Sequence, residues 1–265
     1  MKRIIRIVLA LFISANLSAQ VGGISGSKLS AVCVDVVDHH KLEFEPAFYH
    51  VRSSQTWDAD GHLQDIFGSA DSINHNTGIN FRMTYGLWDK LEIGGTISTD
   101  LQMSNWGLRY VVYDKNKVGF AVVAGANIPF GNKPIDKTIR LADNLTSVGG
   151  GGVMSVQFNE NLSLDVNAQY MAFTQKTIED NKGSLYFNAD LGYYVFKHQL
   201  QLIGSLAYQQ TKFQDFTSKT LTVYPGFTLE TGKNYILVLS VPFDVYGQNA
   251  IKNTGFVMAL TLTFD

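Results

Sequence analysis

The chain has 265 residues, of which 45% are hydrophobic, 12% aromatic and only 17% charged, with a formal net charge of −2. Soluble domains usually carry about 25% charged residues, and disordered chains have few aromatics and a high net charge, so neither class fits. The single cysteine excludes a disulfide framework, and the charge balance gives no basic surface for nucleic acid. Low charge with a mean hydropathy near zero indicates that apolar residues are concentrated on particular faces.

Residues 1–19 have the three parts of a secretory signal peptide. Three basic residues precede an apolar run over 7–13, and small and polar residues follow as far as Ala19. The run is too short for a spanning helix, which needs about 20 apolar residues. We therefore expect cleavage after Ala19, which removes three positive charges and changes the net charge from −2 to −5. Residues 20–41 are then predicted to form a periplasmic N-terminal segment.

Apolar and polar residues alternate through most of the remaining chain. In the clearest stretch, 162–173, leucine, valine, alanine and tyrosine alternate with serine, aspartate, asparagine and glutamine. Period two over this length predicts a β-strand with one apolar and one polar face. Soluble strands average about five or six residues, whereas a tilted strand needs roughly 9–11 to cross a bilayer. Twelve strands are predicted, many of them long enough to cross: 42–50, 77–85, 91–98, 105–113, 118–128, 147–157, 162–173, 184–196, 200–210, 219–230, 235–245 and 256–264.

The connections between these strands are of two kinds. Those after the even strands are tight, whereas those after the odd strands, such as 51–76, 129–146 and 246–253, are longer on the whole. Short turns at one end and long loops at the other are typical of outer-membrane barrels, and an even strand count puts both chain ends on the periplasmic side. We expect an all-β fold, a transmembrane antiparallel up-and-down β-barrel of about 12 strands over 42–265, in the outer membrane of a Gram-negative cell.

Aromatic residues near the short turns support this interpretation, because outer-membrane barrels carry aromatic girdles at the membrane interfaces. The alternative is a soluble β-sandwich, which would explain the alternation but not the strand length, the loop asymmetry or the girdle. The candidate girdle residues are Tyr85, Trp88, Tyr113, Phe158, Tyr194, Phe196, Tyr235 and Phe264.

If the apolar faces meet lipid, the polar faces line the lumen. Glu43 and Glu45 lie on the strand next to Arg82, so cross-strand pairing is expected. Two interpretations stay open, a charge ladder that fills a narrow barrel and a constriction that selects a substrate. Twelve strands lie between filled barrels of about 8 and open ones of about 16–18, so the strand count does not decide. The candidate constriction residues are Glu43, Glu45, Arg82, Glu92, Arg109, Asp165, Asn167 and Asp190.

No residue is assigned a catalytic or metal-binding role. None of the six histidines can be matched with a nucleophile at the barrel rim. The first long loop combines histidines and aspartates, which could hold a divalent ion, but without a recognised ligand spacing we expect an ordinary solvated loop. These loop residues are Asp58, Asp60, His62, Asp65, Asp71 and His75. Gly149–Gly152 lacks the Lys-Ser/Thr of a phosphate loop and indicates a bend or a close approach by the contents of the lumen.

Three stretches, at 42–46 (LEFEP), 81–94 (FRMTYGLWDKLEIG) and 126–131 (ANIPFG), resemble a family of bacterial outer-membrane barrels named for the MetA pathway of phenol degradation. The resemblance implies passage of small, often aromatic or hydrophobic, compounds across the outer membrane and brings no binding residues with it. The end of the leader is also similar to exported proteins of Bacteroidetes.

We therefore expect a monomeric barrel that acts as a passive channel for small solutes, with no enzymatic activity and no cofactor. Its expected partners are outer-membrane lipid, the solutes, periplasmic chaperones and the barrel assembly machinery, but not nucleic acid. Two alternatives remain: a structural barrel whose loops bind a partner at the cell surface, and an outer-membrane hydrolase with its site at the rim.

Overall fold

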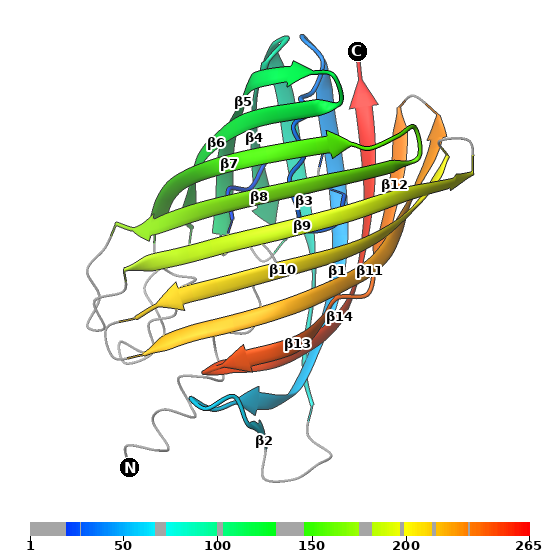
Figure 1. Cartoon of the computed structure of the whole chain (residues 1–265). Helices are drawn as coiled ribbons and strands as arrows, with labels where there is room; N and C mark the ends of the chain where they lie inside the picture. Colours follow the sequence, from blue (N-terminus) through cyan, green and yellow to red (C-terminus); the bar gives the residue numbers. More distant parts are fainter. Residues whose placement is uncertain are drawn as a thin grey trace.

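A computed structural model describes residues 20–26, 28–66, 73–99, 103–130, 146–174, 182–196, 199–213, 216–232 and 234–265, so the predicted signal peptide lies outside the described residues. The described chain folds into β-strands (Figure 1). Their bounds are β1 (Leu42–Trp57), β2 (Leu63–Asp65), β3 (Asn74–Trp88), β4 (Leu91–Ser98), β5 (Met103–Lys115), β6 (Val118–Pro129), β7 (Ser147–Gln157), β8 (Leu162–Phe173), β9 (Gly183–Phe196), β10 (Leu200–Lys212), β11 (Thr217–Gly232), β12 (Tyr235–Ser240), β13 (Phe243–Gln248) and β14 (Ala250–Phe264).

These strands form a closed antiparallel barrel. The first and last long strands, β1 and β14, pair along their whole length and seal the sheet. Both β12 and β13 pair with β11 and β14, so they are two halves of one strand. The strand is interrupted at Val241 and Pro242, where proline supplies no N–H to the ladder. With the short hairpin strand β2 set aside, the prediction of a twelve-stranded up-and-down barrel is confirmed.

The strands run further than predicted at the long-loop end. The connection predicted as a long loop over 246–253 is the single residue Asn249, with φ of 46°, and this prediction is wrong. Here β1 and β14 continue through 52–56 and 252–255, where consecutive residues are polar or glycine, so the alternation that marks the membrane-spanning part of each strand disappears. The C-terminus lies at the opposite end, among the short turns (Figure 1).

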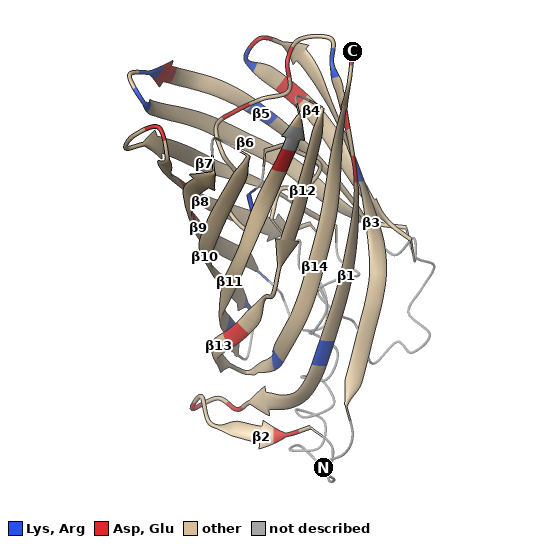
Figure 2. Cartoon of the chain, turned by 90° about the vertical axis from the view of Figure 1, so that its right-hand side faces the viewer, with Lys and Arg blue, Asp and Glu red and all other residues tan. Residues whose placement is uncertain are grey.

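The outer face of the barrel is apolar. Large hydrophobic side chains 36% or more exposed occur on every long strand except β1 and β11, and most of the strand length carries no charge (Figure 2). Exposure on this scale fits a surface solvated by lipid rather than by water. Most of the predicted girdle is exposed as expected, but Tyr194 faces the lumen, where its hydroxyl donates a hydrogen bond of 2.6 Å to Glu230. The exposed girdle residues are Trp88, Tyr113, Phe158, Phe196, Tyr235 and Phe264.

No helix among the described residues is long and apolar enough to span a membrane.

The lumen of the barrel is occupied by the chain that precedes β1. The sequence predicts a periplasmic segment over 20–41, but residues 20–38 lie inside the barrel, as the dark blue trace in Figure 1 shows. We call residues 20–38 the N-terminal segment. Val21, Ile24, Val32 and Val34 form one buried apolar cluster with inward side chains of β5–β9. Removing these apolar side chains from water stabilises the segment inside the barrel, which is why it is not the periplasmic stretch predicted from the sequence.

Candidate functional site: the occupied lumen

A buried ion pair lies at the centre of the lumen. Glu92 on β4 and Arg109 on β5 are direct cross-strand partners, both side chains are fully buried, and Arg109 Nη2 lies 2.9 Å from Glu92 Oε1. Two charges in so dry a place are stable only when further hydrogen bonds satisfy them. These bonds come from the N-terminal segment and not from solvent.

Glu92 and Arg109 together bind the main chain of the segment. Glu92 accepts hydrogen bonds from the backbone N–H groups of Ser25, at 2.9 Å, and Val37, at 2.8 Å. Arg109 donates to the carbonyl oxygens of Ser25, at 3.0 Å, Cys33, at 2.7 Å, and Asp35. The ion pair therefore holds Ser25 together with a stretch, 33–37, that begins eight residues further along the segment.

The polar residues of β7, β8 and β9 hold the rest of the segment. Asp190, which is fully buried, accepts from the N–H groups of Leu29, at 2.8 Å, and Ser30, at 3.1 Å. Asn167 on β8 accepts from the N–H of Val32 at 2.9 Å. Similar bonds run from the N–H groups of Val21 and Val34 to Gln169 Oε1 and Ser155 Oγ. Because most of these acceptors bind backbone groups, the barrel recognises the path of the segment more than its side chains.

Glycines in β4, β5 and β6 make room for the segment. Gly94, Gly107 and Gly125 lie directly opposite one another across the three strands. A Cβ on Gly94 would collide with the carbonyl oxygen of Gly23, and one on Gly107 with that of Gly22. The absence of side chains here lets two backbones approach closely.

Gly94→Ala is therefore expected to loosen the N-terminal segment, because the new methyl group and the Gly23 carbonyl cannot occupy the same space. We expect at least a severalfold rise in the rate at which a maleimide labels Cys33, the only cysteine of the chain and buried within this segment. Gly152→Ala is the matched control, since a Cβ there meets nothing within 4 Å. Equal labelling rates in the two variants would contradict the role given to Gly94.

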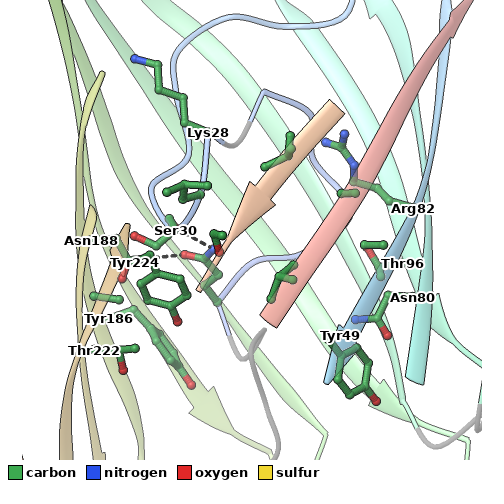
Figure 3. Close-up of a pocket in the computed structure, with 18 of the residues that line it drawn as sticks. Lys28, Ser30, Tyr49, Asn80, Arg82, Thr96, Tyr186, Asn188, Thr222 and Tyr224 are labelled. Atoms are coloured by element: carbon green, nitrogen blue, oxygen red, sulfur yellow. Dashed lines mark hydrogen bonds between the residues drawn. The ribbon is translucent and has the colours of Figure 1, made fainter. Parts of the chain in front are cut away.

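Two cavities lie beside the segment in the described part of the lumen. The segment binds along β4–β9, and the remaining space follows β1, β3 and β10–β14. One cavity, of about 240 Å³ and drawn in Figure 3, lies toward the long loops, and we call it the loop-side cavity. The other, of about 350 Å³, opens toward the short turns. The two cavities share Lys28, Glu45, Arg82 and Val238 in their linings, so these side chains, which we call the junction, lie between them.

Ion pairs fix the side chains of the junction. Arg82 Nη2 lies 2.8 Å from Glu45 and 3.6 Å from Glu43, which is the cross-strand pairing predicted from the sequence. Lys28 Nζ from the segment lies 2.6 Å from Asp165 on β8. The junction therefore carries both signs of charge, contributed by two opposite walls of the barrel and by the segment.

The structure places all of the predicted constriction residues in the lumen, but most of them contact the N-terminal segment. Arg82, Glu92, Arg109, Asp165, Asn167 and Asp190 bind the N-terminal segment, whereas Glu43 and Glu45 hold Arg82. The sequence interpretation missed the segment itself. Its signal is the group of valines, isoleucine and glycines within 21–37, too apolar for an exposed periplasmic stretch.

The cavity toward the long loops is lined by aromatic and polar side chains. Tyr49 from β1, Tyr186 from β9 and Tyr224 from β11 point into it, with Asn80, Thr96, Asn188 and Thr222 between them (Figure 3). Its volume lies just below the roughly 300–1,000 Å³ of sites for drug-sized ligands. Stacking faces combined with hydroxyl and amide groups suit a small compound with one aromatic ring.

The acidic first loop is ordered by its own hydrogen bonds. The Asp58 carboxylate accepts from the backbone N–H groups of Asp60 and His62, each at 2.9 Å. The bond from His62 lowers the pKa of Asp58. Ligand atoms of these three residues lie within 4.8 Å of one another, but exposed acidic groups are common without an ion. Asp71 lies outside the described residues.

Comparisons with known proteins agree with this architecture. An outer membrane channel from Pseudomonas putida F1 superposes with a TM-score of 0.71 at 13% identity, covering 87% of this chain and 98% of that chain. The KdgM porin in complex with oligogalacturonate gives 0.52 at 9% identity, covering 83% and 99%. The NanC porin gives 0.52 at 7% identity, covering 83% and 98%. These similarities show the fold of an outer-membrane barrel.

The sequence comparisons identify the family. No curated protein gives a significant match to the sequence. The family model described as "Putative MetA-pathway of phenol degradation" matches residues 95–260, which is more than half of the chain. The chain therefore belongs to this family.

Proposed function

We propose that the protein is an outer-membrane channel for small aromatic or hydrophobic compounds, which pass along the free side of the lumen. The observation that carries this proposal is the pair of cavities that reach toward opposite ends of the barrel with the junction between them. Two similar structures are named as porins and one as an outer membrane channel, and the family is named for phenol degradation. Transport in this scheme is passive and involves no reaction at the rim.

The route has two parts with different chemistry. A solute from the long-loop side first meets the three tyrosines of the loop-side cavity, where an aromatic ring can stack. It then passes Lys28, Glu45 and Arg82, where the ion pairs set the width of the opening. Under this proposal the constriction predicted from the sequence consists of the junction, and Glu92, Arg109, Asn167 and Asp190 act by holding the segment that forms one wall.

Planar-bilayer recordings of the purified full-length protein test the proposal. We expect a small, stable conductance that is transiently blocked by a neutral single-ring compound such as benzyl alcohol, because the ring occupies the loop-side cavity. A protein that conducts neither in its native form nor after removal of the N-terminal segment is not a channel. That result would favour a structural barrel whose loops bind a partner.

Ala207→Trp supplies a sharper version of this test. Ala207 lines the loop-side cavity, so an indole there is expected to lower the conductance by about twofold or more and to abolish the block by benzyl alcohol. Leu206→Trp is the matched control, because the neighbouring side chain is 50% exposed on the outer face. If both variants show the conductance of the native protein and the same block by benzyl alcohol, the route does not run through this cavity.

A further inference from the structure

The cavity at the short-turn end is strongly acidic. The carboxylates in its lining outnumber the cationic groups by six to three. The carboxylates are Asp35, Glu43, Glu45, Asp114, Asp165 and Glu230, and the cations are Lys28, Arg82 and Lys117. Asp35 comes from the N-terminal segment and the others from four different strands, β1, β5, β8 and β11, so negative charge surrounds the cavity on several sides.

Half of these carboxylates have no ion-pair partner among the described residues. Lys28 pairs with Asp165, and Arg82 pairs with Glu43 and Glu45. No ion pair within the described chain joins Asp35, Asp114 or Glu230 to a lysine or arginine. Glu230 accepts a hydrogen bond from the Tyr194 hydroxyl, which fixes its position.

Two other carboxylates of the cavity lie near enough to Asp35 to act on it. Desolvation inside the barrel and, next, the Asp165 carboxylate raise the pKa of Asp35, and Asp114 adds to the effect. Nearby Arg109 and Lys28 act in the opposite direction. A positively charged solute in the cavity would relieve this repulsion.

A second, independent feature points to an occupant of the same cavity. Thr228 on β11 is 5% exposed and lines the cavity, yet its hydroxyl has no hydrogen-bond partner in the described structure. A buried hydroxyl without a partner costs free energy, and a hydrated cation or an ammonium-bearing solute would supply one. The acidic groups and this hydroxyl share one space.

We infer that this cavity is a cation-selective vestibule, so that the channel takes neutral and positively charged aromatic solutes and rejects aromatic carboxylates. Rings of aspartate and glutamate select cations in other channels by the same electrostatics. The inference rests on the proposed channel function and adds the charge class of the solute to it.

The test is the reversal potential of the native channel under a tenfold gradient of KCl. We expect a potential of the sign for cation permeation, and the triple variant Asp35→Asn, Asp114→Asn, Glu230→Gln is expected to lose most of it. A single carboxylate a few ångströms from the path changes the local cation concentration about threefold, so single variants give graded shifts. Glu160→Gln is the control, because this exposed residue lies in a short turn at the same end but does not line the cavity.

Blocking by matched solutes gives a second measurement that needs no variant. Benzylamine, as its ammonium ion, is expected to block the current more strongly than benzoate. A conducting native protein with no selectivity, with anion selectivity or with stronger block by benzoate overturns the vestibule but leaves the channel intact. Absence of conductance, both in the native protein and after removal of the N-terminal segment, instead overturns the channel and the vestibule with it.

Discussion

Arg109→Leu is expected to free the N-terminal segment from the barrel wall and to destabilise the native state. The substitution leaves the Glu92 carboxylate buried without its partner and removes the donor to three carbonyl oxygens of the segment. Breaking a buried ion pair by removing one partner typically costs about 3–5 kcal/mol. Release of the segment lowers this cost, because water can then enter and solvate Glu92.

Cys33 reports the release directly. Its side chain is 6% exposed, and burial raises the pKa of the thiol, so less thiolate is available in the native protein and maleimide labelling is slow. In Arg109→Leu we expect labelling to accelerate by at least about tenfold, as the thiol regains an ordinary pKa in water. Arg52→Leu is the control, since Arg52 is an exposed arginine on β1. Unchanged labelling in Arg109→Leu would show that the ion pair does not retain the segment.

Removal of residues 20–38 is expected to give an open pore. Every barrel side chain that binds the segment would then face a water-filled lumen, while the sheet keeps the hydrogen bonds between its own strands, including the β1–β14 seam. We expect the single-channel conductance to rise at least about fivefold, since a wide lumen replaces two small cavities with the junction between them. Heat-modifiable migration on a gel checks that the truncated barrel still forms.

The truncation has two informative contrary results. If the barrel forms but its conductance stays at the native level, the loops and not the segment limit the current. If the barrel no longer forms, the segment is part of the folding core, and Gly94→Ala then becomes the milder means of displacing it. A conductance above the native value in Gly94→Ala, with Gly152→Ala unchanged, supports the same conclusion without truncation.

The strands could be predicted from the sequence because lipid outside and polar groups inside impose period two on every membrane-spanning residue. Leu162–Phe173 shows this well: the predicted strand and the observed β8 have the same bounds. The same parity predicts that Glu92, Arg109 and Asp190 face the lumen. Where strands extend past the membrane, as around Asn249, this constraint is absent, and the long loop predicted there is wrong.

The partners of these lumen residues could not be predicted in the same way. The contacts of Ser25 and Val32 with the barrel are made through backbone N–H groups, and main-chain bonds leave no pattern of side chains to detect. Parity also places Glu45 and Asn167 on the same inner face, but only the position of the segment decides that Glu45 lines a cavity whereas Asn167 binds the segment. Glycines such as Gly94 and Gly107 did carry a signal, since glycine within a strand indicates close approach.

The seam between the first and last strands has a consequence for the order of assembly. Leu42 pairs with Phe264, so the barrel closes only when the two ends of the domain meet, and pairings so distant along the chain form slowly. The segment lies immediately before β1 and is enclosed by the same closure. It must therefore settle against β4–β9 while the sheet is still an open, curved surface, or else thread into a finished cylinder and dehydrate Arg109 on the way. The first order is the easier one, so we expect the sheet to close around a segment that is already bound to β4–β9.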